Sequence, residues 1–146
     1  MIRTAHVGLI AVLGLAVING CAEKGPSKKP LTKVKGIVHV DGVPAAQVNV
    51  TCNDVMGIDK TEPTVTTAIT NADGSFALST YETGDGIPAG EYTLTFFWGE
   101  LNVMTMTVGG PDKLNNRYAD VKNGIPLKVE SSEPVDLGVI NLKTKD

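Results

Sequence analysis

Residues 33–44 read KVKGIVHVDGVP, and this stretch decides the fold class. Val34, Gly36, Val38 and Val40 lie at every second position, and they alternate with Lys33, Lys35, Ile37 and His39. A period of two is typical of a β-strand with one buried face, whereas a helix repeats every 3.6 residues. The dipeptide Asp41-Gly42 follows, and both residues tolerate the positive φ of a tight hairpin turn. The stretch therefore predicts a strand, a turn and the start of a second strand.

The same period recurs along the rest of the chain. Further candidate strands cover 48–52, 64–70, 76–78, 92–98, 102–108, 127–130 and 135–142. Turn residues separate them, with Asp73-Gly74 as a second tight turn and Gly90 at the entry to the aromatic strand 92–98. No stretch has the period of an amphipathic helix. The spacing predicts an all-β fold over 33–146, an antiparallel Ig-like or transthyretin-like β-sandwich of seven or eight strands.

One face of these strands should form the core. Its expected members are Val34, Val38, Val48, Val50, Phe76, Leu78, Tyr92, Leu94, Phe96 and Leu127, with part of 135–142. Cys52 alternates with two of the valines, which favours a buried, unreactive thiol. Tyr92 has a polar tip that can bond a buried backbone group, as in a tyrosine corner.

Composition excludes several classes of function. The 146 residues include 13 basic and 16 acidic side chains, a net charge of −3, so no basic surplus exists for a nucleic acid. Two cysteines and two histidines cannot build a multi-cysteine zinc site. The sequence therefore predicts one domain with no metal, no cofactor and no nucleic-acid partner.

The N-terminus has the pattern of a bacterial export signal. An apolar run at 7–18 is too short to cross about 30 Å of hydrocarbon comfortably, but it suits a signal peptide over 1–20. Residues 18–21, Ile-Asn-Gly-Cys, resemble a bacterial lipobox. The resemblance implies cleavage before Cys21, a thioether-linked diacylglycerol on its sulfur and acylation of its amino group. Residues 21–32, with two prolines and no apolar period, are expected to form the lipidated N-terminus and a flexible tether.

Lipidation implies a location and a partner. Acyl chains on Cys21 would hold the protein stably on a membrane. Ala22 rather than aspartate follows the cysteine, which by resemblance to enterobacterial sorting favours the outer membrane. We therefore expect a lipid-anchored protein of the bacterial cell envelope, facing the periplasm or the cell surface.

Four motifs occur in the order found in one domain family. They are VKGIV at 34–38, DGVPAAQV at 41–48, TNADGSF at 70–76 and PAGEYTL at 88–94, followed by DKLNNRYAD at 112–120. The combination resembles the carboxypeptidase regulatory-like domain, of transthyretin-like (prealbumin) sandwich type, and the short lipoproteins of that type abundant in Planctomycetes. The resemblance covers about 33–142 and implies a β-sandwich; the family name describes an accessory domain and implies no peptidase chemistry.

Few residues are candidates for binding or catalysis. Phe96 and Trp98 are expected to face inward, which leaves Phe97 and Tyr118 as exposed aromatic candidates for a sugar-binding surface. Arg117 lies in the same polar loop and is a candidate for loop pinning or ligand capture.

Three hypotheses follow. The first is a non-catalytic structural or interaction module for envelope proteins or polymers. The second is a carbohydrate-binding module that uses Phe97, Trp98 or Tyr118. The third and least favoured is a hydrolase around His39 and Asp41, because no nucleophile motif accompanies them. The sequence thus predicts a protein that is not an enzyme.

Overall fold

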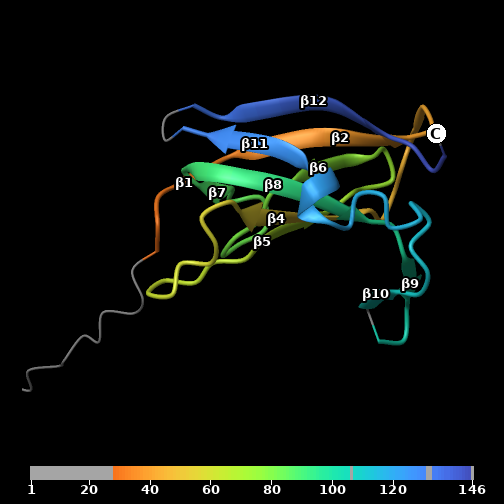
Figure 1. Ribbon diagram of the computed structural model, residues 1–146, viewed down its shortest axis with the longest axis horizontal. Helices are drawn as coiled ribbons and strands as arrows, with labels where there is room; N and C mark the ends of the chain where they lie inside the picture. The colour runs from red at the N-terminus through yellow and green to blue at the C-terminus, as the bar shows by residue number, and fades with distance from the viewer. Residues whose placement is uncertain (1–27, 106, 131–132, 146) are drawn as a thin grey trace, which may run out of the picture.

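The computed structural model describes residues 28–105, 107–130 and 133–145, and Cys21 lies outside them. Two four-stranded sheets face each other (Figure 1). The first sheet has the order β11 (Ile125–Val129), β8 (Gly90–Phe97), β4 (Asn49–Asp54) and β5 (Thr66–Ile69). In the second, β2 (Val34–Val40) pairs with β12 (Val135–Leu142) on one side, and with β3 (Val43–Pro44) and β6 (Ser75–Ala77) on the other. The predicted all-β sandwich is confirmed.

Smaller elements complete the body. Strand β1 (Leu31–Thr32) pairs with β7 (Ile87–Pro88), so the ordered fold begins before the expected boundary at residue 33. Strand β9 (Glu100–Asn102) pairs with β10 (Thr107–Gly109) in a hairpin that projects from the sandwich (Figure 1). A single 3₁₀ turn, η1 (Val121–Asn123), is the one helical element among the described residues.

One strand pair departs from the expected antiparallel arrangement. The last strand, β12, lies parallel to β2, with Val135 opposite Val34 and Leu142 opposite Val40. An irregularity in the register falls between Asp136 and Val139. Hydrophobic period shows which face of a strand is buried, but it carries no information about strand direction.

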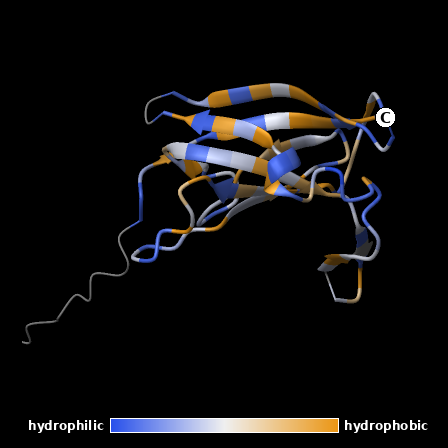
Figure 2. Ribbon diagram, viewed as in Figure 1, coloured by the Kyte–Doolittle hydropathy of each residue, from blue (hydrophilic) through white to orange (hydrophobic). Residues whose placement is uncertain are grey.

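The core lies between the two sheets. All ten residues expected there are buried, and β12 adds Ile140 and Leu142. Apolar and polar residues alternate along β2, β11 and β12 (Figure 2). Because the two inner faces supply the apolar side chains, burial of this surface is the main force that holds the sheets together.

The single strand expected over 102–108 is wrong. Asn102 ends β9, and its side-chain oxygen accepts hydrogen bonds from the backbone N–H of Met104 (3.0 Å) and of Thr105 (3.2 Å). The chain turns there and returns as β10, with Thr107 opposite Asn102. Asparagine is a strong turn former, and its side chain here outweighs the β-propensity of the residues that follow.

The two predicted tight turns have different roles. Asp41 (φ 50°) and Gly42 (φ 84°) make the two-residue turn between β2 and β3. The Asp41 carboxylate accepts from Thr144 N–H (3.1 Å) and Oγ1 (2.6 Å), so this turn also fixes the C-terminal segment. Gly74 closes a turn by donating to the Asn71 carbonyl (2.9 Å). That second turn carries the chain from β5 in one sheet to β6 in the other.

Replacing Thr70 with valine is expected to lower the free energy of unfolding by about 1–3 kcal/mol. Thr70 is 3% exposed; its Oγ1 donates to the Ala45 carbonyl (2.6 Å) and accepts from Val48 N–H (2.9 Å). Valine has a similar shape but leaves both backbone groups buried without a partner. Urea unfolding followed by Trp98 fluorescence measures the loss. The Thr67→Val variant is the control, because the Thr67 side chain makes no hydrogen bond within the described part of the chain; equal effects would refute this role.

Candidate functional site

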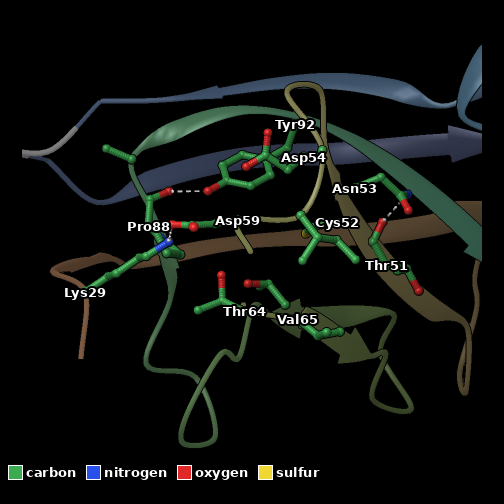
Figure 3. Close-up of a pocket in the computed structure, with 14 residues that line it drawn as sticks. Lys29, Thr51, Cys52, Asn53, Asp54, Asp59, Thr64, Val65, Pro88 and Tyr92 are labelled. Atoms are coloured by element: carbon green, nitrogen blue, oxygen red, sulfur yellow. Dashed lines mark hydrogen bonds and ion pairs between the residues drawn. The ribbon is translucent and has the colours of Figure 1, made fainter. Parts of the chain in front are cut away.

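A pocket of about 300 Å³ opens at the end of the sandwich where β4 finishes. Its walls come from β4, the loop 55–65, the turn between β7 and β8, and the beginning of the described chain (Figure 3). Side chains that line it include those of Lys29, Thr51, Cys52, Asn53, Asp54, Asp59, Thr64, Val65, Pro88 and Tyr92. The period of hydrophobic residues could not identify this pocket, because three segments that are far apart in the chain contribute to it: residue 29, residues 51–66 and residues 88–92.

Tyr92 is buried, 8% exposed, on the inner face of β8. Its hydroxyl donates to the Pro88 carbonyl four residues upstream (2.9 Å), the bond expected of a tyrosine corner. Gly90 lies against the ring, because a Cβ there would be 3.1 Å from the Tyr92 hydroxyl oxygen. Burial, with the charge of the nearby Asp54 adding to it, raises the pKa of Tyr92 to about 12. The phenol is therefore a neutral structural donor at physiological pH.

Cys52 is half-buried in the pocket wall, and burial raises the pKa of its thiol to about 12. The thiolate is the reactive form of cysteine, so this side chain is a poor nucleophile at neutral pH.

We expect iodoacetamide to alkylate Cys52 in the folded protein at pH 8 at least about 100-fold more slowly than an exposed cysteine. A Cys21→Ala variant leaves Cys52 as the single thiol, since the sequence has two cysteines. Adding Met104→Cys and Cys52→Ala to it supplies an exposed reference, because Met104 is 92% exposed. Mass spectrometry follows both rates, and comparable rates would contradict the burial argument.

An ion pair forms one rim of the pocket. Lys29 Nζ lies 2.7 Å from Asp59 Oδ2, while Asp59 Oδ1 accepts from the N–H and Oγ1 of Thr61 and from Glu62 N–H. The hydrogen bond from Lys29, followed by those from Thr61 and Glu62, holds the pKa of Asp59 well below its usual range. The same bond raises the pKa of Lys29. Both groups are charged at neutral pH, and the pair fastens the start of the described chain to the loop 55–65.

The Asn53 side chain in the wall is also hydrogen-bonded. Asn53 Nδ2 donates to the Thr93 carbonyl (3.1 Å) and to Thr95 Oγ1 (3.0 Å) across the first sheet. The pocket thus combines a neutral thiol, a neutral phenol and a paired carboxylate. Among the described residues, no group of three or more His, Cys, Asp or Glu side chains is placed to hold a metal ion.

Trp98, one of the candidate binding residues, is fixed by bonds to the chain itself. Its indole Nε1 donates to the Ala46 carbonyl (3.0 Å), and its backbone N–H donates to Asp112 Oδ1 (2.9 Å). Lys113 Nζ lies 5.4 Å from the centre of the indole ring. The ring packs against the core, as its position in the alternation predicts.

Tyr118 is not the exposed aromatic residue that the sequence predicts. It packs edge-on against Phe96, with ring centres 6.3 Å apart, and its hydroxyl accepts from Lys143 N–H (3.1 Å). Phe97 is half-buried on the opposite face of β8 from Phe96. Arg117 and Tyr118 line one shallow hollow together with Asn123. The structure therefore brings two of the four candidates, Arg117 and Tyr118, together in one hollow.

Asp112 organises this loop, and sequence reasoning did not single it out. It is 9% exposed, and its carboxylate accepts backbone N–H bonds from Trp98 (2.9 Å), Leu114 (3.0 Å) and Asn116 (3.0 Å). The bonds to Leu114 and Asn116 are local, so aspartate two residues before Leu114 was an available turn signal. The hydrogen bond to Trp98 joins residues 14 apart in the chain, and no local sequence pattern predicts it.

Two solved structures are similar to this chain at low identity. One is a DUF3823 family protein from Parabacteroides merdae ATCC 43184, 14% identical with a TM-score of 0.40, matched over 80% of this chain and 46% of that one. The other is an (S)-allantoin synthase, 18% identical with a TM-score of 0.44, matched over 81% and 42%. This chain thus spans less than half the length of either. No protein-family model and no curated protein matches it.

Proposed function

We propose that this chain is a lipid-anchored, non-catalytic module of the bacterial cell envelope that serves as a structural or interaction domain. Its four ordered motifs support membership of the carboxypeptidase regulatory-like type. The export signal and the sequence Ile-Asn-Gly-Cys at 18–21 support lipidation of Cys21, and Ala22 supports the outer membrane. No helix among the described residues is long and apolar enough to span a bilayer.

One observation carries the non-catalytic part of the proposal. The polar side chains that could take part in chemistry form hydrogen bonds with the chain's own backbone: Asp112 with three N–H groups, Tyr92 with the Pro88 carbonyl, and Trp98 with the Ala46 carbonyl. A hydrolase would depend on His39 and Asp41, but the Asp41 carboxylate is occupied by Thr144. These side chains maintain the shape of the domain, which leaves loops and sheet edges as its means of interaction.

The sheet edges suit protein or polymer partners. Strand β12 is an outer strand of the second sheet and β11 is an outer strand of the first, whereas the outer edge of β5 is already bonded to Ser79 through Thr67. An edge strand presents backbone N–H and C=O groups that an extended partner can bond. Val139 on β12 is 47% exposed and adds an apolar contact to that edge.

Labelling with a clickable palmitate analogue tests the anchor. The wild-type chain should incorporate label and enter the detergent phase of Triton X-114, whereas Cys21→Ala should do neither. Crosslinking in intact cells, followed by purification of the lipidated chain, then tests the interaction role. Absence of label would refute the lipid anchor, and absence of any crosslinked envelope protein or polymer would refute the interaction role.

A carbohydrate-binding module is the second candidate, and the hollow shared by Arg117, Tyr118 and Asn123 favours it. A glycan array probed with the detergent-solubilised full chain tests this alternative. Saturable binding that is lost in Arg117→Ala would support it. If binding survives in Arg117→Ala, or if no glycan binds, the hollow is not a carbohydrate-binding site.

A further inference from the structure

The loop after β4 exposes an uninterrupted apolar segment. In this apolar loop, residues 55–58, Val55 is 60% exposed, Met56 92% and Ile58 68%, with Gly57 between the last two. The nearby Val65 is 65% exposed. Single exposed apolar residues are common on protein surfaces, but a contiguous group of this kind marks a contact surface.

The apolar loop lies at the end of the sandwich where the described chain begins (Figure 1). Lys29 is held there by Asp59, directly after the loop, and by a bond from its backbone N–H to the Tyr81 hydroxyl (3.1 Å). Lys28 Nζ lies 3.0 Å from Glu82 in the neighbouring loop. The point at which the N-terminal segment joins the body is therefore fixed beside the apolar loop.

Chain length brings this end of the body close to the proposed anchor. Seven peptide units separate Cys21 from Lys28, and seven residues span at most about 25 Å when fully extended. A bilayer that holds acyl chains on Cys21 therefore lies within about 25 Å of this end of the sandwich.

The apolar loop keeps its shape through backbone bonds. Val55 N–H donates to the Glu91 carbonyl (3.0 Å), Met56 N–H to Asp54 Oδ1 (2.8 Å), and Gly57 N–H to the Asp54 carbonyl (3.1 Å). Its side chains are presented to solvent on a preformed turn, so a contact there loses little conformational entropy.

We propose that the apolar loop is a second membrane contact, which inserts the side chains of Met56 and Ile58 into the lipid surface beside the anchor. The inference rests on the proposed lipidation of Cys21. Once one end is anchored, a weak second contact acts within the same molecule at high effective concentration, so a few apolar side chains suffice. The β9–β10 hairpin lies at the other end of the body from the apolar loop (Figure 1), so the contact would orient the sandwich with that hairpin away from the membrane.

Apolar insertion, not charge, drives this contact. The acidic side chains around the loop, Asp54, Asp59, Glu62 and Glu82, outnumber the basic ones, Lys28, Lys29 and Lys60. Electrostatic attraction to anionic lipid requires a basic excess, which is missing here. Vesicles of zwitterionic phosphatidylcholine are therefore a sufficient probe.

The test uses the full lipidated protein in phosphatidylcholine vesicles, in a Cys52→Ala background. Met56→Cys carries the environment-sensitive dye NBD, and Met104→Cys is the matched control, because both methionines are 92% exposed. The apolar loop and the β9–β10 hairpin, to which the two positions belong, lie at opposite ends of the body (Figure 1). Lipids with a nitroxide on the acyl chain quench a dye that enters the bilayer. We expect quenching at position 56 about threefold or more above that at position 104, with a blue-shifted emission.

Equal, weak quenching at both positions, in protein that floats with the vesicles, would overturn the second contact and leave the anchor intact. Protein that fails to float, with no difference between the parent and Cys21→Ala, would overturn the anchor itself and the contact that rests on it. The flotation assay thus separates the two failures.

Discussion

Gly74→Ala is expected to lower the free energy of unfolding by about 3 kcal/mol or more, the sum of backbone strain and a steric clash. Gly74 has φ +76°, a conformation that costs an alanine about 1–2 kcal/mol. A Cβ there would also lie 2.4 Å from the Val38 carbonyl oxygen. That oxygen accepts from Ala45 N–H (3.0 Å), and Val38 N–H donates to the Gly74 carbonyl (2.8 Å), so neither strand can move without losing a bond.

Gly42→Ala is the matched control for this prediction. Gly42 has a similar φ of +84°, but a Cβ there would meet nothing within 4 Å. Its replacement should therefore cost the backbone strain alone, about 1–2 kcal/mol. Urea unfolding of both variants, followed by the fluorescence of Trp98, gives the difference. If the two variants lose equal free energy of unfolding, the close approach of Gly74 to β2 contributes nothing to the stability difference.

Gly74 shows how far the sequence predicts this fold. The motif Asn71-x-Asp73-Gly74 indicates a turn on local chemistry alone, because these residue types tolerate it. The contact with the Val38 carbonyl joins residues 36 apart and depends on the pairing of β6 with β2. The same division holds elsewhere: alternation predicted the ten core residues, while the parallel direction of β12 beside β2 depends on the path between sheets.

The candidate site was less predictable than the core. Tyr92 and its bond to the Pro88 carbonyl follow a local pattern, and that bond was expected. Tyr118 was expected at the surface because it lies in a polar loop, yet the loop folds back and packs its ring on Phe96. The fold-back depends on Asp112, whose bond to Trp98 N–H joins distant segments. The spacing of hydrophobic residues indicates which side chains are buried in helices and strands. It does not indicate that a loop is buried when long-range hydrogen bonds hold the loop in place.

Asp112→Ala is expected to lower the free energy of unfolding by about 3 kcal/mol, since hydrogen bonds to a charged group contribute about 1.5–3 kcal/mol and buried N–H groups are left unpaired. The three N–H donors belong to Trp98, Leu114 and Asn116, so the loss is shared between the end of β8 and the loop that follows β10. The amides of these residues should also exchange with deuterium faster than those in the centre of β8.

Asp120→Ala is the control, because it shows how much free energy of unfolding is lost when an ordinary aspartate is removed from a turn. Asp120 is exposed and its carboxylate accepts from one backbone N–H, that of Lys122 (2.9 Å). Its removal should cost about 1 kcal/mol or less, the usual value for a cap at the surface. Asp112→Asn keeps the side-chain shape and one acceptor oxygen, so its loss should fall between those of the two alanine variants. Were Asp112→Ala no more damaging than Asp120→Ala, the loop would be held by the packing of Leu114 and Tyr118 against the core, and the buried carboxylate would be incidental to it.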